Sequence, residues 1–220
     1  MDGLLVDTEK IWLHVHAAVF DEIGVDVRPL LGRGLTTGMR VDEAVGLFRG
    51  LLGFTGPSDS ELAARVVDGV LAAIPGEARL LPGALESLDF CARNGLAVAL
   101  ASGSVAPVID AVLARFELHD RFAVVVSAEA VEAGKPHPEV LLLTAAKLGT
   151  EPVRCVVVED ALNGCIAAKA ARMRVVAVPE SATACDPRWV LADLVLGSLV
   201  EFAGPEVSAL LGLVPAGREL

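Results

Sequence analysis

The first third of the chain carries apolar residues at the spacing of amphipathic helices. Apolar side chains recur every three and four residues in three segments, which this pattern predicts to be helices: 8–24, 40–52 and 58–74. Glycine-rich joints at 32–38 and 53–57 separate them. No alternating pattern favours a strand here. The sequence therefore predicts a small all-helical module.

The remainder of the chain alternates short apolar runs with helical segments. The apolar runs are predicted to be strands: 96–101, 122–127, 155–158, 175–178 and, more weakly, 194–196. Helices are predicted between them: 105–116, 138–148 and 161–172. Alternation of this kind is typical of a parallel sheet with helices on both faces. We therefore expect an α/β fold.

Composition narrows the class of protein. The chain has 220 residues, 54% of them hydrophobic, and a net charge of −11. That apolar share excludes general disorder, and the length suffices for one core with a small accessory domain. The acidic balance argues against nucleic acid or an anionic membrane surface as a partner. An anionic small substrate would need a local cation, which a bound metal ion could supply.

The cysteines and the N-terminus indicate a cytoplasmic protein. Cys91, Cys155, Cys165 and Cys185 show no CxxC spacing, and we interpret them as reduced core thiols. No apolar run approaches the roughly 18 residues of a membrane span. Met1 is followed by an acidic residue, unlike a signal peptide.

Polar residues follow the predicted strands at the end where ligands bind in parallel α/β folds. Ser102 and Gly103 follow the first strand, where a hydroxyl and free N–H groups at a helix start form an anion site. Helix capping by the serine is the alternative. Lys135, next to Pro136, follows the second strand on a stiffened backbone that suits an anion clamp. An ordinary surface lysine is the alternative there.

Two further groups of acidic residues are candidate sites. Glu159 and Asp160 end an apolar strand, where paired carboxylates are costly unless a cation meets them. Mg²⁺ is the natural candidate. Near the N-terminus, Asp2 and Gly3 open a run typical of a tight loop that carries working carboxylates. A frayed terminus is the alternative for that stretch.

Taken in order, four segments of the chain resemble the motifs of the haloacid dehalogenase-like phosphohydrolases: DGLLVDTE, ASGS, GKPHP and VVVEDALNG. The resemblance covers the whole chain. It implies a Rossmann-like parallel-sheet core at 1–9 and 80–203, an inserted all-helical cap at 10–79, and a C-terminal tail at 204–220. The stretch from Lys135 to Asp193 is similar to bacterial phosphatases that act on 2-deoxyglucose 6-phosphate and hexitol phosphates.

The resemblance also implies a reaction. In the family an aspartate attacks phosphorus, an aspartyl-phosphate forms, and water hydrolyses it. Asp2 matches the acid/base aspartate two residues after that nucleophile. Lys135 matches the lysine that neutralises the nucleophile and the phosphate, while Ser102 and Gly103 match the groups that hold the phosphoryl oxygens.

The metal and substrate contacts are implied in the same way. Asp2, Glu159 and Asp160 match the residues around the family's Mg²⁺. In the cap, Arg40 matches an arginine that reaches toward the substrate in relatives, with a surface charge as the alternative. Trp12 is either a platform facing the sugar or a core residue. His14 and His16 lie on different sides of their helix and show no ligand geometry.

The chain departs from the family at its start. The attacking aspartate would lie immediately before Met1, and the apolar strand that leads into the loop is missing. Losing about five buried strand side chains at roughly 2 kcal/mol each forfeits about 10 kcal/mol of burial, as much as a typical domain's stability of about 5–15 kcal/mol. We therefore expect the native chain to start upstream.

The most plausible function is a Mg²⁺-dependent phosphomonoesterase acting on a small sugar or polyol phosphate, as a monomer or weak dimer. Two alternatives stay open. A phosphomutase of the β-phosphoglucomutase type shares every core motif. A non-catalytic protein that binds metal and phosphate would fit the absence of the nucleophile.

Overall fold

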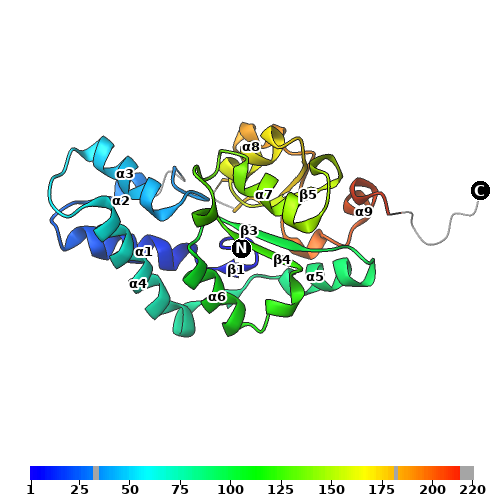
Figure 1. Cartoon of the computed structure of the whole chain (residues 1–220), viewed down its shortest axis with the longest axis horizontal. Coiled ribbons are helices and arrows are strands. Elements are labelled where there is room, and N and C mark those ends of the chain that lie inside the picture. Colours follow the sequence, from blue (N-terminus) through cyan, green and yellow to red (C-terminus); the bar gives the residue numbers. More distant parts are fainter. Residues whose placement is uncertain (32–34, 181–182, 214–220) are drawn as a thin grey trace, which may run out of the picture.

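The computed structural model describes residues 1–31, 35–180 and 183–213. Four helices gather on one side of the molecule: α1 (Glu9–Asp21), α2 (Arg28–Leu31), α3 (Val41–Leu52) and α4 (Asp59–Glu77). The strands and the helices that cover them lie on the other side (Figure 1). The predicted helices are confirmed at the positions of α1, α3 and α4. The short α2 was not predicted, and part of the predicted joint at 32–38 lies outside the described residues.

Local sequence explains where these helices begin and end. Ser58 accepts a hydrogen bond from the Glu61 N–H while the Glu61 side chain accepts from the Ser58 N–H, so that α4 begins with a complete capping box. Gly53 ends α3 in the left-handed conformation, with φ of +66°. Phe20 and Phe48 are fully buried between the helices and contact each other edge to face. The helical layer therefore has its own aromatic core.

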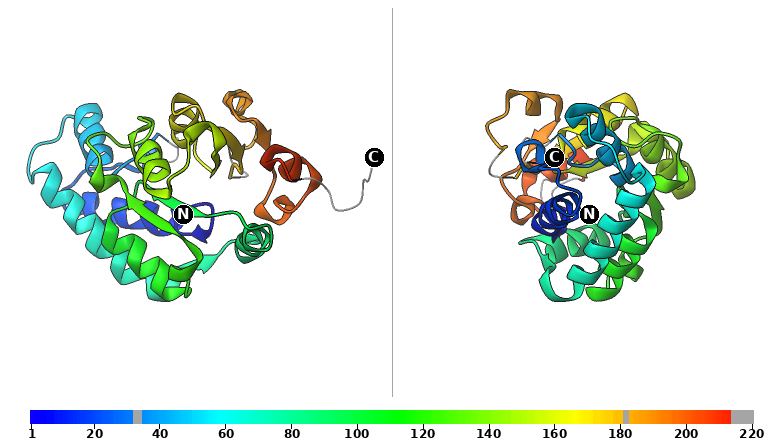
Figure 2. Two further views of the ribbon diagram at one scale, coloured as in Figure 1. Left: turned by 45° about the vertical axis from the view of Figure 1, so that its right-hand side comes forward. Right: turned by 90° about the vertical axis from the view of Figure 1, so that its left-hand side faces the viewer.

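The chain passes between the helical layer and the sheet region at two points that lie side by side. β1 (Val6–Asp7) and β2 (Arg79–Leu80) pair antiparallel, with Val6 opposite Leu80. Figure 2 also shows α4 next to α6 (Ala106–Arg115), and these helices contact each other. Both features tie the helical layer to the sheet region.

All strand pairs of the main sheet region are parallel, as the alternating sequence pattern predicts. β3 (Ala99–Ser102) pairs with β4 (Val124–Ser127), while β6 (Arg174–Ala177) lies between β5 (Val156–Glu159) and β7 (Leu194–Val195). In Figure 1, α7 (Glu139–Leu148) and α8 (Leu162–Ala170) lie on one side of these strands, opposite α5 (Ala84–Arg93) and α6. The α/β class predicted from the sequence is confirmed.

Helix α5 and the terminal helix α9 (Pro205–Leu211) complete the described fold. The sequence did not predict α5, which starts directly after the Pro82-Gly83 turn and is only ten residues long. It is held by packing against a distant segment, where Phe90 contacts Phe202 edge to face. Periodicity along one short segment does not reveal such a partner. The predicted tail beyond residue 213 lies outside the described residues.

The parallel strands form two separate sheets in the described structure. An apolar cavity of about 400 Å³ lies between β3 and β5, and both strands line it. Val156, Val157 and Val158 are consequently only partly buried. One edge of β5 therefore faces the cavity rather than a neighbouring strand.

Two smaller expectations concern cysteine burial and membrane spans. All four cysteines are unpaired, and Cys165 is buried. Cys185 is exposed, so the interpretation of all four as core thiols is wrong for this one, which follows β6 in a surface loop. Across the described ranges, every helix is too short or too polar to cross a bilayer.

Candidate active site

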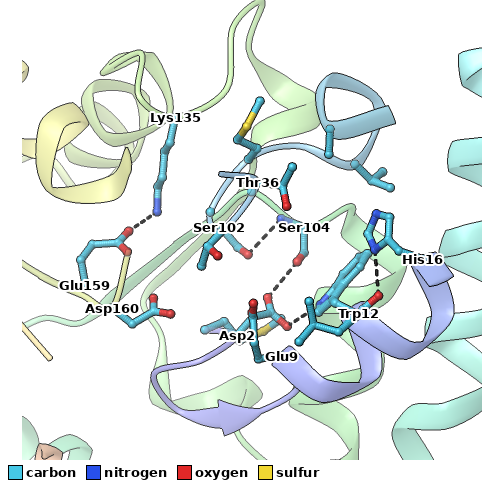
Figure 3. A pocket seen from close by; sticks show the side chains of 18 of the residues that line it. Asp2, Glu9, Trp12, His16, Thr36, Ser102, Ser104, Lys135, Glu159 and Asp160 are labelled. Atoms are coloured by element: carbon cyan, nitrogen blue, oxygen red, sulfur yellow. Dashed lines mark hydrogen bonds and ion pairs between the residues drawn. The ribbon is translucent and has the colours of Figure 1, made fainter. Parts of the chain in front are cut away.

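A pocket of about 90 Å³ opens where the helical layer meets the carboxyl ends of β3 and β5. Its floor comes from the N-terminal loop and these strand ends, and its roof from the segment 36–44 of the helical layer. Parallel α/β sheets place ligands at this end of the strands. Figure 3 shows the polar side chains that point into the pocket. Asp2, Ser102, Lys135 and Asp160, predicted from four separate motifs, all line it.

Asp2 lies on the pocket floor and is oriented by three hydrogen-bond donors. The Thr8 hydroxyl donates to Oδ1 at 2.6 Å and the Ser104 hydroxyl donates to Oδ2 at 2.8 Å. The Trp12 indole N–H donates to Oδ1 at 3.3 Å (Figure 3). Donors from the start of α1 and from the segment after β3 thus fix both carboxylate oxygens. The alternative of a frayed terminus therefore does not hold for Asp2.

Thr8 and Ser104 are site residues that the sequence prediction missed. Thr8 is fully buried and stands at the N-cap position of α1; its side chain makes no capping bond, and its hydroxyl donates to Asp2. Ser104 is the last residue of the ASGS segment, and its place in that motif was the signal that could have identified it. Trp12 is also more than a core residue, since it lines the pocket and contacts Asp2.

Ser102 and Gly103 form the part of the floor at the end of β3. Ser102 is buried, and its hydroxyl oxygen accepts a hydrogen bond from the Ser104 N–H at 3.1 Å. Within the described ranges the Ser102 hydroxyl donates to no protein group, so its proton is available to a ligand. A Cβ on Gly103 would lie 2.7 Å from the Gly38 carbonyl oxygen, which only glycine avoids. The roof of the pocket therefore sits directly on this turn.

Lys135 is buried beside the pocket and forms an ion pair with Glu159. Its ammonium also donates to the Ala101 carbonyl at 3.2 Å, while 5% of the lysine side chain and 9% of the glutamate side chain are exposed. An ammonium can donate three hydrogen bonds, and Ala101 and Glu159 accept two of them, so one N–H remains for a ligand. The structure thus places Glu159 as the counter-ion of Lys135. Its predicted role as a direct metal ligand stays a prediction.

Asp160 lies across the pocket from Asp2 and packs against Gly3. A Cβ on Gly3 would come within 2.2 Å of Asp160 Oδ2, and Gly3 has φ of +66°. Burial, reinforced by the adjacent Glu159, raises the pKa of Asp160 to about 8. A carboxyl group whose ionisation is this unfavourable is suited to meet a cation. The glycine allows that carboxylate to lie against the N-terminal loop.

Glu9 adds a carboxyl group that the sequence prediction did not include. It lines the pocket beside Asp2, and burial, with smaller contributions from Glu180 and Asp2, raises the pKa of Glu9 to about 6. The folded protein therefore holds the Glu9 proton more tightly than the unfolded chain does. Stability is lost as the pH rises from about 4.5 through 6, because the ionised form is the one that folding disfavours.

We expect Glu9→Gln to stabilise the protein at neutral pH. At pH 7.5 the free energy of unfolding should increase by about 1 kcal/mol, the value expected for a shift of this size in a partly exposed group. At pH 4 the variant and the parent should be equally stable, since Glu9 is then protonated in both states. Urea unfolding in EDTA at the two pH values measures the difference. An equal gain at both values would contradict this account.

Arg40 does not line the pocket in this structure. Its guanidinium pairs with Asp42 at 2.6 Å and donates to the carbonyls of Val131 and Glu132 at 3.1 and 3.4 Å. Nearby, the Gly134 N–H donates to Glu43 at 2.9 Å. The start of α3 is thereby fastened to the loop that carries Lys135. The predicted contact of Arg40 with the substrate is not made in this arrangement, because Asp42 and the loop carbonyls take up its donors.

The donor set fits a hard cation only in part. Asp160 offers carboxylate oxygens and Asp2 a backbone carbonyl oxygen, the kind of ligand that Mg²⁺ prefers. Within the described ranges, no three acidic, histidine or cysteine side chains cluster closely enough to enclose a metal ion. Mg²⁺ commonly takes one or two carboxylates and completes its shell with water and phosphate oxygens. Asp2 and Asp160 therefore fit this open kind of site.

A family model and curated proteins that resemble this chain point to the same family. The model of the haloacid dehalogenase-like hydrolase family matches residues 1–172. Hexitol phosphatase B of Escherichia coli K12 is 41% identical over 207 residues, covering 94% of this chain and 93% of that protein. Protein CbbY of Rhodobacter capsulatus is 32% identical over 88% of this chain and 91% of its own.

Solved structures agree with the fold. The crystal structure of CbbY from Rhodobacter sphaeroides in complex with phosphate has a TM-score of 0.80 at 27% identity, covering 92% of this chain and 93% of that one. A β-phosphoglucomutase from Clostridium difficile has a TM-score of 0.83, covering 96% and 94%. At 21% identity, this second likeness concerns the fold alone.

Proposed function

The chain belongs to the haloacid dehalogenase-like hydrolase family, and from that premise we propose that it hydrolyses the phosphomonoester of a small sugar or polyol. The observation that carries this proposal is the meeting of Asp2, Ser102, Lys135 and Asp160 in one pocket. A cation, a hydroxyl donor and two carboxylates suit a phosphoryl group and the proton transfers of its hydrolysis. The 41% identity to hexitol phosphatase B favours a polyol or sugar phosphate over other phosphomonoesters.

Each residue of the pocket has a proposed part in the reaction. The Lys135 ammonium, through the proton that no protein acceptor in the described part of the chain takes, and the Ser102 hydroxyl donate hydrogen bonds to the phosphoryl oxygens. These hydrogen bonds become stronger as negative charge develops on the oxygens. Asp2, aligned by Thr8 and Trp12, donates a proton to the leaving oxygen and later takes one from water. The resemblance assigns the attacking aspartate to the position directly before Met1.

Mg²⁺ is the proposed cofactor. Asp160 and Asp2 would hold it, which fits the raised pKa of Asp160 and the open donor set. Bound there, the ion would supply positive charge to the phosphoryl oxygens. Cytoplasmic location and a monomer or weak dimer stay predictions.

The segment 36–44 has the proposed role of a movable roof. The pocket of about 90 Å³ has room for a phosphoryl group and a few waters, whereas pockets for whole small molecules are typically about 300–1,000 Å³. Gly38 rests on Gly103, and Arg40 fastens α3 to the Lys135 loop. Release of these contacts would admit the sugar, and their return would exclude water during the reaction.

We expect Gly3→Ala to weaken metal binding. The new methyl group would displace the Asp160 carboxylate, whose Oδ2 lies within 2.2 Å of the added Cβ position. The Mg²⁺ concentration that gives half of the maximal rate should rise at least about ten-fold, in line with the loss of one oriented ligand. Thermal unfolding with increasing Mg²⁺ should show a correspondingly smaller stabilisation.

Gly24→Ala is the matched control for backbone strain. Gly24 has φ of +72°, close to that of Gly3, but a Cβ there would meet nothing within 4 Å. Both variants should lose about 1–2 kcal/mol of stability from the left-handed conformation. Unchanged Mg²⁺ dependence in Gly3→Ala, or an equal change in Gly24→Ala, would refute the role of Gly3.

The first test of the function is phosphate release from a panel of hexitol phosphates, 2-deoxyglucose 6-phosphate, glucose 6-phosphate and β-glucose 1-phosphate with Mg²⁺. A phosphatase releases inorganic phosphate from at least one of them with a kcat/KM of about 10⁴ M⁻¹s⁻¹ or more. Isomerised sugar phosphate with little free phosphate would favour the mutase alternative. Binding with no turnover of any substrate would favour the non-catalytic protein.

A further inference from the structure

A buried histidine in the wall of the pocket lacks a partner on one ring nitrogen. His16 is 6% exposed and lines the pocket together with Trp12 from the same helix. Within the described ranges, His16 Nε2 is the one buried side-chain nitrogen or oxygen that makes no hydrogen bond. A buried polar atom without a partner lowers stability, because it has lost its hydrogen bonds to water without replacing them. Such an atom beside a ligand pocket calls for a specific explanation.

The tautomer of His16 follows from its other nitrogen. Nδ1 lies 2.8 Å from the Trp12 carbonyl oxygen, which only accepts hydrogen bonds, so Nδ1 carries the proton. Burial lowers the pKa of His16, which keeps the ring neutral at neutral pH. In a neutral ring with a proton on Nδ1, Nε2 is an acceptor. His16 therefore carries one unused acceptor, which lies buried in a residue of the pocket wall.

The ring itself is held firmly. It packs edge to face against Phe48 at a centroid distance of 5.8 Å and lies 5.9 Å from the Trp12 ring. In Figure 3 the Nδ1 edge faces the Trp12 carbonyl, and the other ring nitrogen points away from that carbonyl. Trp12 in turn donates to Asp2. The acceptor is therefore held rigidly, and Trp12 lies between it and Asp2. It belongs to the helical layer, on the side of the pocket toward which the rest of a substrate would extend.

We propose that His16 Nε2 accepts a hydrogen bond from a hydroxyl group of the sugar or polyol and so helps to determine specificity. This inference rests on the proposed function and names a part of the substrate that the pocket recognises. Polyol and sugar phosphates differ from other small phosphomonoesters in carrying a row of hydroxyl donors. A site that uses a buried acceptor for such a donor disfavours analogues that lack it, because the acceptor is then left unpaired.

The test couples a change in the protein with a change in the substrate. His16→Phe keeps the packing against Phe48 and removes the acceptor. The substrates are the best hexitol phosphate of the panel and its monodeoxy analogues. For one hydroxyl position, either change alone should lower kcat/KM about ten-fold, the value of one neutral hydrogen bond. Both changes together should lower it no further.

Two matched variants separate recognition from structure. His16→Gln keeps an acceptor near the Nε2 position and should restore most of the lost kcat/KM. His14→Phe, at an exposed position of the same helix, should leave every substrate unaffected. An equal loss for all analogues, or no loss in His16→Phe, would overturn the proposal.

Calorimetric binding of the same phosphates distinguishes failure of this inference from failure of the proposed function. If the parent protein hydrolyses none of them but binds one with the same dependence on His16 and its hydroxyl, the inference stands and the hydrolase proposal falls. If the parent protein hydrolyses the phosphates and His16→Phe has the same kcat/KM as the parent for each of them, only the proposed role of His16 is refuted. If no phosphate is bound or hydrolysed, both are overturned.

Discussion

Replacing Asp2 with asparagine should lower kcat for phosphate release by about 10²–10⁴-fold. The amide keeps the size of the side chain but no longer accepts or gives up the proton that the leaving oxygen and the water require. The change also presents N–H groups to Thr8, Trp12 and Ser104, which all donate to Asp2. Steady-state kinetics on the best substrate of the panel measure the loss.

Asp7→Asn is the control for this variant. Asp7 lies close by in β1, but 37% of its side chain is exposed and its salt bridge is to the exposed Lys10. Surface pairs of this kind contribute about 0–1 kcal/mol, so activity and stability should change little. Retention of more than a tenth of the parent kcat by folded Asp2→Asn would remove Asp2 from the proposed reaction.

The second large effect is expected for Lys135→Met. Removal of the ammonium leaves the buried Glu159 carboxylate without its counter-ion, which costs about 3–5 kcal/mol of stability for a buried pair. Loss of a cation that holds phosphoryl oxygens should also lower kcat by about 10²–10³-fold. Urea unfolding measures the first effect, and phosphate release at a temperature where the variant is folded measures the second.

The double variant Lys135→Met, Glu159→Gln separates these two effects. Neutralising Glu159 removes the unpaired charge, so much of the stability should return while the activity stays low. Lys147→Met, at an exposed position on α7, should change neither quantity. Recovery of activity together with stability in the double variant would mean that Lys135 serves only to hold the fold.

Most of the fold could be predicted because each element shows its own period in the sequence. The helices α1, α3 and α4 carry apolar residues every three and four positions, and the strands are short apolar runs. Helix α5 was missed although its buried residues Ala84, Ser87 and Leu88 recur at helical spacing, whereas its contact between Phe90 and the distant Phe202 could not be predicted. The split of the sheet into two parts was likewise invisible to a local pattern.

In the site, sequence motifs identified residue types better than their partners. Glu159 and Asp160 are neighbours in the chain but face different groups, because Glu159 is the last residue of β5 and Asp160 begins the turn that follows it. Glu159 meets Lys135, and Asp160 meets Gly3. The sequence treated both acids alike as metal ligands. Only the fold distinguishes the counter-ion from the free carboxylate.

His16 illustrates the same limit for a single residue. The helical pattern placed it away from His14 and suggested no ligand geometry. Its significance comes from burial against Phe48 and from an unused Nε2 in the pocket wall. Neither the burial of His16 nor its unpaired Nε2 can be deduced from the residue type or from its position in the sequence pattern. Hydrogen-bond accounting in three dimensions was needed to find it.

Phosphorus NMR of one hexitol phosphate incubated with the protein and Mg²⁺ tests the central claim most directly, because substrate, isomeric phosphate esters and inorganic phosphate are resolved in one time course. The account predicts that the substrate signal is replaced by inorganic phosphate alone, and that Asp2→Asn slows this conversion at least a hundred-fold. Accumulation of an isomeric phosphate ester without free phosphate, or release at the same rate by Asp2→Asn, would contradict it.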